Sequence, residues 1–541
     1  MALPSGTQQI QHLPIKIVGG NHFGRYPKIS IEQTFNMIIS DETLIDYSGY
    51  KNVLTLAEDA TGRGAYVSSI RDIIIAVVGN TVYKISFIAG DLVSVPVGVL
   101  ATSTGQVFIA ENNANQIAIT DYVNLYIYNY GTEDFFTSNA GGPLGFPFPT
   151  TGAPYVNPGF VSFQNGRFII ALTNTSTWIL SDFNNGLSWP ADAAHTGSLQ
   201  TKPDFVQAAV PFPGRGNTLF VIGNNVIESW VDVGSAKFPY QKATSFNIDY
   251  GVINPSTISP LENFIVWLSI NEQSGLAIMV TDGGSIRTIS TDGINFKLGK
   301  LNNPENCTGF LFRQDGHLLY QFTFIEDNLS YVYDFTSQMF FTVTDEHLNY
   351  HIARDVVFFN NTYYFVSIND GNLYEFSTNF SYLQYAEDNI KQMPRIRITP
   401  PVRFPNNRYF VTKKLQFLME NGQPNNIQTF IHQGNVVAET IATESGIILA
   451  TEDGDQIGTE EVISADDTIY QVASERILLS KSIDGGENFG SSINQDMNPT
   501  GKRRGLIEFQ RLGMQNDLTY KIEFNGFGRF VVGDGIIEVY Q

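Results

Sequence analysis

One turn near the C-terminal end combines a serine, an aspartate, glycines and an aromatic residue in a fixed spacing. Residues 482–489 read Ser-Ile-Asp-Gly-Gly-Glu-Asn-Phe, which places Ser482, Asp484, Gly486 and Phe489 at the defining positions of an Asp box. In such a turn the aspartate accepts backbone N–H bonds, glycine takes the left-handed conformation, and the aromatic ring packs into the core. The pattern predicts a structural brace. Residues 290–296 repeat part of it in contracted form.

Glycoside hydrolysis is the first reaction to consider, because Asp boxes are familiar from sialidases and other propeller glycosidases. Sialidase-like chemistry needs an arginine cluster that holds a carboxylate, and a tyrosine nucleophile with an acidic partner. Arg403, within Val402-Arg-Phe-Pro405, resembles the arginine-bearing motif that opens such enzymes, but it follows the repeats described below. We therefore expect no catalytic activity. The alternative is a carbohydrate-active propeller, either a sialidase-like hydrolase or a lectin.

Three other groups of residues fall short of a metal site or a nucleophile. His347 and His351 are four apart, but in a strand that spacing separates them by ~13 Å. Residues 453–464 begin like a calcium loop and lack its later acidic ligands. Cys307 is the single cysteine, so it cannot form an intramolecular disulfide or a cysteine-based metal site. We predict that the protein uses no metal and no cofactor.

The charge balance limits the possible partners. The 541 residues include 32 Lys and Arg against 53 Asp and Glu, for a formal charge of −21. A protein whose main task is to grip phosphate backbones by counterion release needs the opposite balance. Lys502, Arg503 and Arg504 are three consecutive cations that introduce a strand. We predict that they form an assembly contact with an acidic neighbouring subunit; a solvated strand entry and a contact with DNA are the alternatives.

Neither export nor membrane insertion is indicated. The first ten residues show no positively charged segment followed by an apolar one, as a secretory signal would. The longest aliphatic run, residues 73–78, is far shorter than the ~20 residues that cross a bilayer. We expect a soluble protein made without export.

Repeated hairpins must position these residues. Sustained helical periodicity is absent, whereas short runs of Val, Ile, Phe, Tyr and Thr alternate with Asn-Gly, Gly-Asn and Asp-Gly pairs that favour hairpin turns. The clearest hairpins span 72–86, 106–120, 165–181, 217–231, 275–290, 316–335 and 361–377. Their tips recur at about the length of a four-stranded propeller blade. The sequence predicts an all-β protein with an irregular β-propeller of five to seven blades over 45–385.

Two further regions flank the predicted propeller. Residues 1–44 precede the repeats and are expected to form an N-terminal arm. Residues 390–541 are expected to form a separate β-sandwich-like domain. Inside it, residues 433–475 contain ten carboxylates and no Lys or Arg. We expect this acidic insertion to stand out into solvent, because self-repulsion disfavours its burial against an acidic surface.

Three passages together resemble the packaged-DNA stabilisation proteins of short-tailed bacteriophages, which serve as the tail hub or nozzle. Residues 217–234 resemble that family's strand, turn and Ile-Glu-x-aromatic hairpin, and residues 275–293 its strand-turn-strand passage. Residues 478–490 and 501–513 resemble its Asp-Gly turn and its arginine-rich strand near the C terminus. The resemblance is diffuse and extends over about 215–541.

The resemblance implies a structural virion protein in the phage tail, made in the host cytoplasm. Such a protein is expected to form a homo-oligomeric ring, commonly of six copies, below the portal and adaptor proteins. The ring would continue the DNA channel, help to retain packaged DNA until ejection, and carry receptor-binding fibres or spikes and the plug protein. DNA would pass through without specific binding, because carboxylates that line a bore repel a duplex.

Overall fold

The computed structural model describes residues 10–24, 31–149, 157–235, 238–271, 275–404, 408–421, 476–497 and 504–540. The acidic insertion predicted at 433–475 lies outside them. The described residues are nearly all β, with one short α-helix, α1 (Asp292–Leu298), and one 3-10 turn, η1 (Pro255–Thr257). The contracted Asp box expected at 290–296 is part of this helix: Thr291 caps its N-terminus by accepting a bond from the Ile294 amide.

Each of the seven hairpins predicted from the sequence forms, and each belongs to a different sheet. The first three sheets consist of β7 (Gly62–Val67), β8 (Ile73–Val78), β9 (Thr81–Ile88) and β10 (Asp91–Val99); β11 (Phe108–Glu111), β12 (Gln116–Thr120), β13 (Leu125–Asn129), β14 (Asp134–Ser138) and β15 (Gly145–Phe146); and β16 (Pro158–Gln164), β17 (Arg167–Leu172), β18 (Thr177–Leu180) and β19 (Thr196–Ser198).

The next four sheets consist of β20 (Val206–Pro211), β21 (Thr218–Gly223), β22 (Ile227–Asp232) and β23 (Tyr240–Ile248); β24 (Ser259–Leu261), β25 (Phe264–Asn271), β26 (Gly275–Thr281) and β27 (Ile286–Thr288); β28 (Cys307–Gln314), β29 (His317–Phe324), β30 (Leu329–Asp334) and β31 (Met339–Thr342); and β32 (Ala353–Phe359), β33 (Thr362–Ser367) and β34 (Asn372–Ser377). We call these seven sheets of the described residues blades one to seven, in chain order.

The blades form a β-propeller. The first strands of successive blades lie side by side around its axis: β7 next to β11, β11 next to β16, β16 next to β20, β24 next to β28, and β28 next to β32. Strand β32 of blade seven lies next to β7 of blade one, so the last blade contacts the first. The second strands are apolar because blades stack on both of their faces; in β8, for example, five of six residues are buried.

An N-terminal strand completes the last blade. β6 (Gly49–Thr55) pairs antiparallel with β34, so the fourth strand of blade seven comes from the other end of the repeat. β35 (Tyr382–Gln384) then pairs parallel with β6 and antiparallel with β36 (Ile390–Gln392). This pairing joins the two ends of the propeller.

Two sheets beyond the propeller face each other. One has the order β4, β5, β44, β39, β42, with β1 paired to β44; the other continues from blade six through β3, β37, β43, β40 and β41. The strands are β1 (Ile10–Ile15), β2 (His22–Phe23), β3 (Ile31–Phe35), β4 (Met37–Ser40), β5 (Thr43–Asp46), β37 (Arg395–Ile398), β38 (Val402–Arg403), β39 (Phe410–Asn421), β40 (Arg476–Ser482), β41 (Ile493–Asp496), β42 (Arg504–Gln515), β43 (Asp517–Asn525) and β44 (Phe530–Tyr540). Side chains from both sheets form one core, including Leu415, Phe417, Ile522, Phe524 and Val532.

These pairings differ from the expected arm at 1–44 and from a separate C-terminal domain. Strands β1, β3, β4 and β5 belong to the two C-terminal sheets. One of those sheets is continuous with blade six, because β3 pairs with β31 on one side and with β37 on the other. The physical reason is that edge strands of the C-terminal part find backbone partners in the N-terminal segment.

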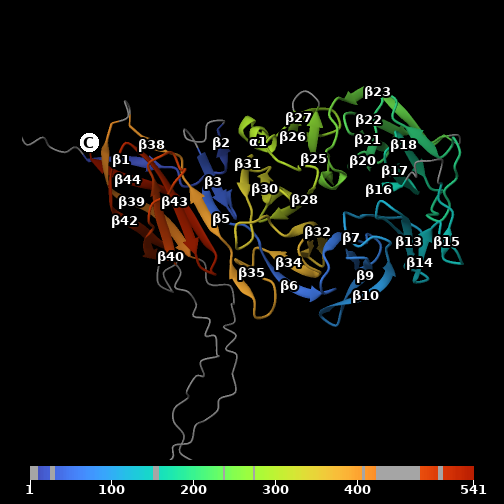
Figure 1. Cartoon of the computed structure of the whole chain (residues 1–541), viewed down its shortest axis with the longest axis horizontal. Coiled ribbons are helices and arrows are strands. Elements are labelled where there is room, and N and C mark those ends of the chain that lie inside the picture. Colours follow the sequence, from blue (N-terminus) through green and yellow to red (C-terminus); the bar gives the residue numbers. More distant parts are fainter. Residues whose placement is uncertain are drawn as a thin grey trace, which may run out of the picture.

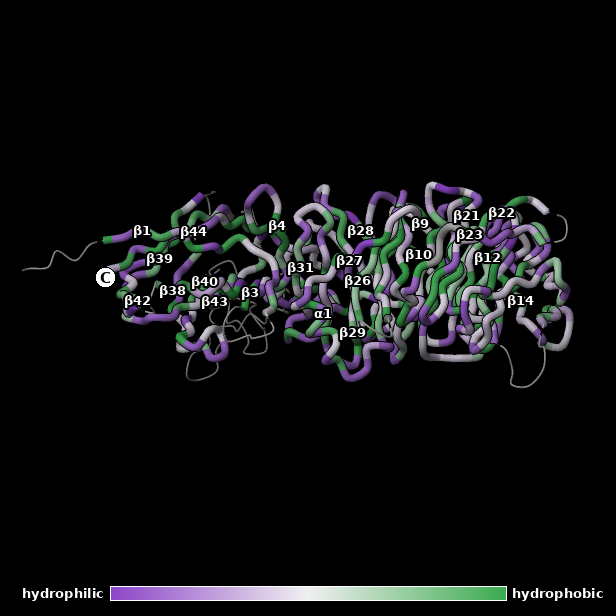
Figure 2. Tube along the Cα trace, turned by 90° about the horizontal axis from the view of Figure 1, so that it is seen from above, coloured by the Kyte–Doolittle hydropathy of each residue, from purple (hydrophilic) through white to green (hydrophobic). Residues whose placement is uncertain are grey.

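Figure 1 shows the resulting elongated molecule, with the C-terminal strands β39, β42 and β44 at one end and β13 to β15 at the other. N-terminal strand β1 lies beside β44. Seen from above, hydrophobic stretches lie mostly along the strands, and hydrophilic ones mostly at the turns (Figure 2). No helix in the described part of the chain is long and apolar enough to span a membrane.

Candidate assembly site

The Asp-box residues lie in the bend that follows β40. The Ser482 hydroxyl donates to Oδ1 of Asp484 at 2.5 Å and accepts a bond from the Gly486 amide at 2.9 Å. Oδ1 of Asp484 also accepts bonds from the amides of Glu487 and Asn488, each at 3.1 Å. The Ser482 hydroxyl, followed by the Asn488 bonds, holds the pKa of Asp484 well below its usual value. The carboxylate thus accepts its hydrogen bonds from groups of its own turn.

The ring of Phe489 does not plug this turn into the core, contrary to the sequence-based expectation. It is half-buried and lies beside Lys521, whose Nζ is 5.6 Å from the ring centroid. The reason is position: Ser482 is the last residue of β40, so the bend projects beyond the sheet whose core contains Leu479 and Ile522.

Of the three cations predicted as an assembly contact, the structure describes one. Lys502 and Arg503 lie outside the described residues. Arg504 is the first residue of β42 and is exposed. β42 is an edge strand of its sheet in the described part of the chain.

The other residues weighed from the sequence lie apart from one another. Arg403 forms an ion pair with Asp517 at 2.8 Å in the pairing of β38 with β43. The side chain of His347 is 75% exposed, whereas His351 is buried among aromatic rings, and burial lowers its pKa to about 3. Cys307 is buried at the start of β28, and burial raises the pKa of its thiol. Within the described residues, no group of three or more His, Cys, Asp or Glu side chains is placed to hold a metal ion.

Two buried arginines on β37 join the N-terminal segment to the C-terminal sheets. Arg395 pairs with Asp46 at 3.0 Å, donates to the carbonyls of Gly526 and Gly528, and lies over the Phe530 ring. Both charged side chains of this pair are at most 3% exposed. We call Arg395 and Arg397, together with their partners, the clamp. Through Arg395 it links strand β5, strand β37 and the turn between β43 and β44.

The second arginine of the clamp, Arg397, reaches the loop between β1 and β2 and strand β3. It donates to the carbonyls of Ile17 at 2.7 Å and Gly20 at 3.3 Å, and it pairs with Glu32 at 2.8 Å. Burial lowers the pKa of Arg397 from its usual value, and Glu32 opposes that shift. Sequence reasoning missed both arginines, because alternation in Arg-Ile-Arg-Ile suggests one polar face, while all four residues are buried.

Two asparagines continue the clamp into blade six. Asn36 is fully buried, and its side chain donates to Thr344 and to the carbonyl of Pro394. Its Oδ1 accepts a bond from the Thr344 amide at 2.8 Å. The Asn21 side chain donates to the Thr342 hydroxyl at 2.9 Å. These bonds attach blade six to the C-terminal sheets at the level of the side chains as well as the backbone.

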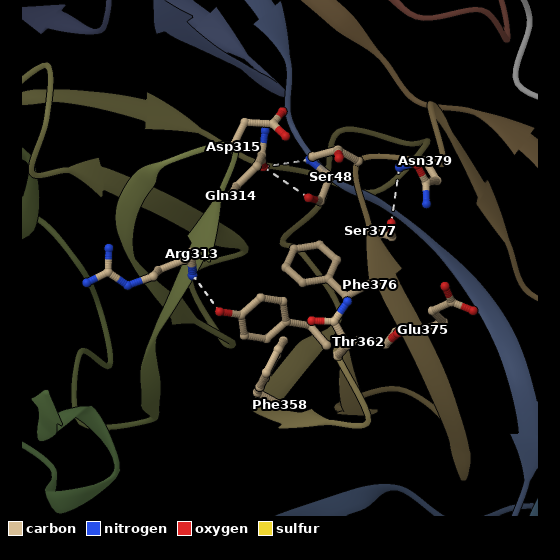
Figure 3. A pocket seen from close by; sticks show the side chains of 13 residues that line it. Ser48, Arg313, Gln314, Asp315, Phe358, Thr362, Glu375, Phe376, Ser377 and Asn379 are labelled. Atoms are coloured by element: carbon tan, nitrogen blue, oxygen red, sulfur yellow. Dashed lines mark hydrogen bonds between the residues drawn. The ribbon is translucent and has the colours of Figure 1, made fainter.

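A cleft of about 350 Å³ lies next to this junction, between blades six and seven (Figure 3). Ser48 closes one side by donating twice to Gln314, each time at 3.0 Å. Phe358 is exposed at the opposite side. Asp315, on the rim, pairs with Arg529 of the turn before β44 at 2.5 Å. The cleft thus adjoins a second attachment between the propeller and the C-terminal part, and one of its carboxylates is already paired.

Polar side chains also link blade seven to blades one and two. Arg354, on the first strand of blade seven, donates to Gln106 at 2.7 Å, immediately before the first strand of blade two. Asp355 accepts bonds from the Ala65 amide at 3.3 Å and from Gln106 at 3.4 Å. Phe160 of blade three packs against three of the hydrophobic clusters that join neighbouring blades.

We expect Asp355 to make the stability of the propeller depend on pH. Burial raises its pKa from 3.8 to about 6, against the opposing attraction of Arg354. Because the folded state then holds the proton more tightly than the unfolded chain, this stabilisation is complete below pH ~4 and is lost as pH rises through about 6. A rise of this size in the pKa corresponds to a contribution of up to ~3 kcal/mol to the free energy of unfolding. Urea unfolding at pH 4, 5, 6 and 7 should show that loss relative to Asp355→Asn; parallel curves for the two proteins would contradict it.

The comparison with protein families agrees with this fold. The family model described as Bacteriophage P22 Gp10, beta-propeller, matches residues 24–381, well over half of the chain. The chain belongs to this family. It is therefore a structural protein of a bacteriophage, as the resemblance in the sequence predicted. The match begins before β3 and covers all seven blades of the described residues.

Other comparisons of this Gp10-family protein add little. No curated protein matches it. Among solved structures, it is similar to the extracellular domain of the putative one component system BT4673 from B. thetaiotaomicron, with 11% identity and a TM-score of 0.39. That similarity covers 61% of this chain and 40% of the other, so this chain spans less than half of that structure.

Proposed function

We propose that this protein is the subunit of a tail hub or nozzle ring, which continues the DNA path and helps to retain the packaged genome. The family match over residues 24–381 carries this proposal. The ring would be a homo-oligomer, commonly of six copies. Its neighbours would be the portal and adaptor proteins, receptor-binding fibres or spikes, and a plug protein.

We infer that the DNA channel lies between subunits and not along the axis of one propeller. Arg354 of blade seven bonds to Gln106 before the first strand of blade two, and Phe160 packs against the clusters between blades, so the blades are tied to one another. DNA would then run along the axis of the ring, past the outer surfaces of several copies. The formal charge of −21 per chain suits such a path, since an acidic wall repels the duplex that it conducts.

The junction of the propeller with the C-terminal sheets also supports this role. A ring that retains DNA under pressure needs subunits that do not hinge. Here one sheet runs from blade six into the C-terminal part, and the buried Arg395 and Arg397 fasten the N-terminal segment across it. Such a subunit transmits force as one body.

The test is a phage whose copy of this gene carries a stop codon, grown with and without the protein supplied from a second copy. Without the protein, we expect heads that fill with DNA and then lose it, and particles that do not infect. Adding purified protein should restore infectivity and a ring of density below the portal in electron micrographs. Infectious, DNA-filled particles made without the protein would overturn the proposal, as would labelled protein located on the capsid shell.

A further inference from the structure

Charge is divided unevenly along the chain. Residues 1–390 contain 17 Lys and Arg against 34 Asp and Glu. The strands of the C-terminal sheets and their shorter connections, within residues 391–421 and 476–541, contain 15 Lys and Arg against 9 Asp and Glu, whereas the connection at 422–475 adds 10 Asp and Glu and no Lys or Arg. The propeller part is thus strongly acidic, whereas the C-terminal sheets carry an excess of positive charge. These strands are therefore a basic part of an otherwise acidic chain.

Part of that positive charge lies exposed along one strand. Most described cations of the C-terminal sheets have partners, such as Arg395 with Asp46. Arg504 and Arg511, both on β42, are exposed and form no ion pair within the described residues. Arg511 has a φ of 58°, where the register of β42 with β39 shifts, so the strand bulges at that residue. β42 therefore presents two exposed guanidinium groups along a sheet edge.

The outer face of the same sheet is apolar in two rows. Ile10, Tyr540, Val411 and Met514 are paired side by side across β1, β44, β39 and β42, so they share one face. Ile10, Val411 and Met514 are 49%, 37% and 67% exposed. The second row pairs Leu418 with Leu506, both exposed, and Ile536 lies exposed on neighbouring β44.

Between these rows the charges neutralise one another. Glu538 accepts from Lys413 at 2.9 Å and lies 3.3 Å from Lys414, while Gln416 donates to Glu508. A partner that covers the apolar rows would therefore bury few unpaired charges here, which is the usual obstacle to covering a mixed surface. We call this surface, together with Arg504 and Arg511 at its edge, the β42 face.

We propose that the β42 face is the docking surface for the acidic propeller of a second copy of this chain. The charge complementarity selects the occupant, because each copy carries both the positive face and the acidic body. It also selects the symmetry: two β42 faces placed together would repel, whereas face to propeller is a heterologous contact, which closes into a ring when the rotation permits. The inference rests on the proposed ring and names the surface that builds it.

The test measures the native mass of purified protein by mass photometry over a series of salt concentrations. For the wild type we expect a multi-copy species that dissociates as salt rises, because exposed charges are screened beyond ~8 Å at physiological ionic strength. Arg504→Glu with Arg511→Glu should raise the protein concentration needed for assembly at least ~10-fold. Leu506→Asp should do the same. Arg215→Glu with Lys300→Glu makes the same charge change at two exposed cations of the propeller and is the matched control; it should not weaken assembly, because it makes the acidic partner more acidic.

A second, less disruptive pair of substitutions distinguishes loss of the contact from misfolding. Arg504→Ala with Arg511→Gly removes both charges and suits the positive φ of residue 511, so its thermal midpoint should not fall while its assembly weakens. Wild-type assembly with an unchanged salt midpoint in these variants would overturn the inference and leave the ring standing. Disulfide-linked dimers of Leu506→Cys, which require two β42 faces together, would also overturn it. A wild type that stays a monomer even with its virion neighbours would instead contradict the proposed function.

Discussion

Replacing Arg395 with methionine should lower the free energy of unfolding by about 3–5 kcal/mol, the largest loss that we expect from a single side chain. Methionine retains much of the volume but leaves the Asp46 carboxylate buried without its cation. It also leaves the carbonyls of Gly526 and Gly528 without the Arg395 donor. Urea unfolding followed by tyrosine and tryptophan fluorescence measures the effect. Arg395→Met should also make the connection between blade six and the C-terminal sheets sensitive to protease.

The matched control for this prediction is Arg403→Met, which removes an arginine from a pair near the surface. The Arg403 side chain is 34% exposed, so loss of its pair with Asp517 should cost less than ~1 kcal/mol. Adding Asp46→Asn to Arg395→Met should recover part of the stability, since it removes the stranded charge. Equal losses for Arg395→Met and Arg403→Met would show that the buried clamp contributes no more than a surface ion pair.

Gly49→Val should prevent the last blade from closing, at a cost of about 3 kcal/mol. Gly49 begins β6, and a Cβ at that position would lie 2.3 Å from the carbonyl oxygen of Tyr382 and 2.6 Å from that of Phe380. Both contacts are backbone atoms, so no side-chain rotation relieves them. β6 would have to leave the place between β34 and β35 where it joins the two ends of the propeller. Calorimetry should show a lower midpoint, and limited proteolysis should cut blade seven first.

Gly141→Val provides the control for closure. Gly141 lies in an exposed loop, is not held at positive φ, and has open space where a Cβ would stand, with no neighbouring atom within 4 Å. The substitution should change stability by no more than ~0.5 kcal/mol. If Gly49→Val and Gly141→Val had the same thermal midpoint, β6 would not be required to hold the ring of blades closed.

The hairpins and the fold class could be predicted from residue order because their causes are local. A turn such as Gly79-Asn80 needs a positive φ, which is 55° at Gly79, and the flanking apolar runs can pack only as strands. The Asp-box turn at 482–489 is local in the same sense, since Ser482 and Asp484 bond to amides within four residues. Membership of the phage family likewise follows from passages that can be read in the chain.

Pairings between distant residues could not be predicted in this way. β6 lies about 320 residues from the strand that it completes, and Arg395 meets Asp46 across 349 positions. The half-burial of Phe489 depends on where β40 ends relative to its sheet, and the β42 face depends on four strands that come together only in the fold. Residue order therefore decides the strands and turns, whose energies are set by neighbours in the chain. The closure of the propeller, its attachment to the C-terminal sheets and the surface offered to a partner are decided by backbone edges and buried charges that find their partners only when the chain is compact.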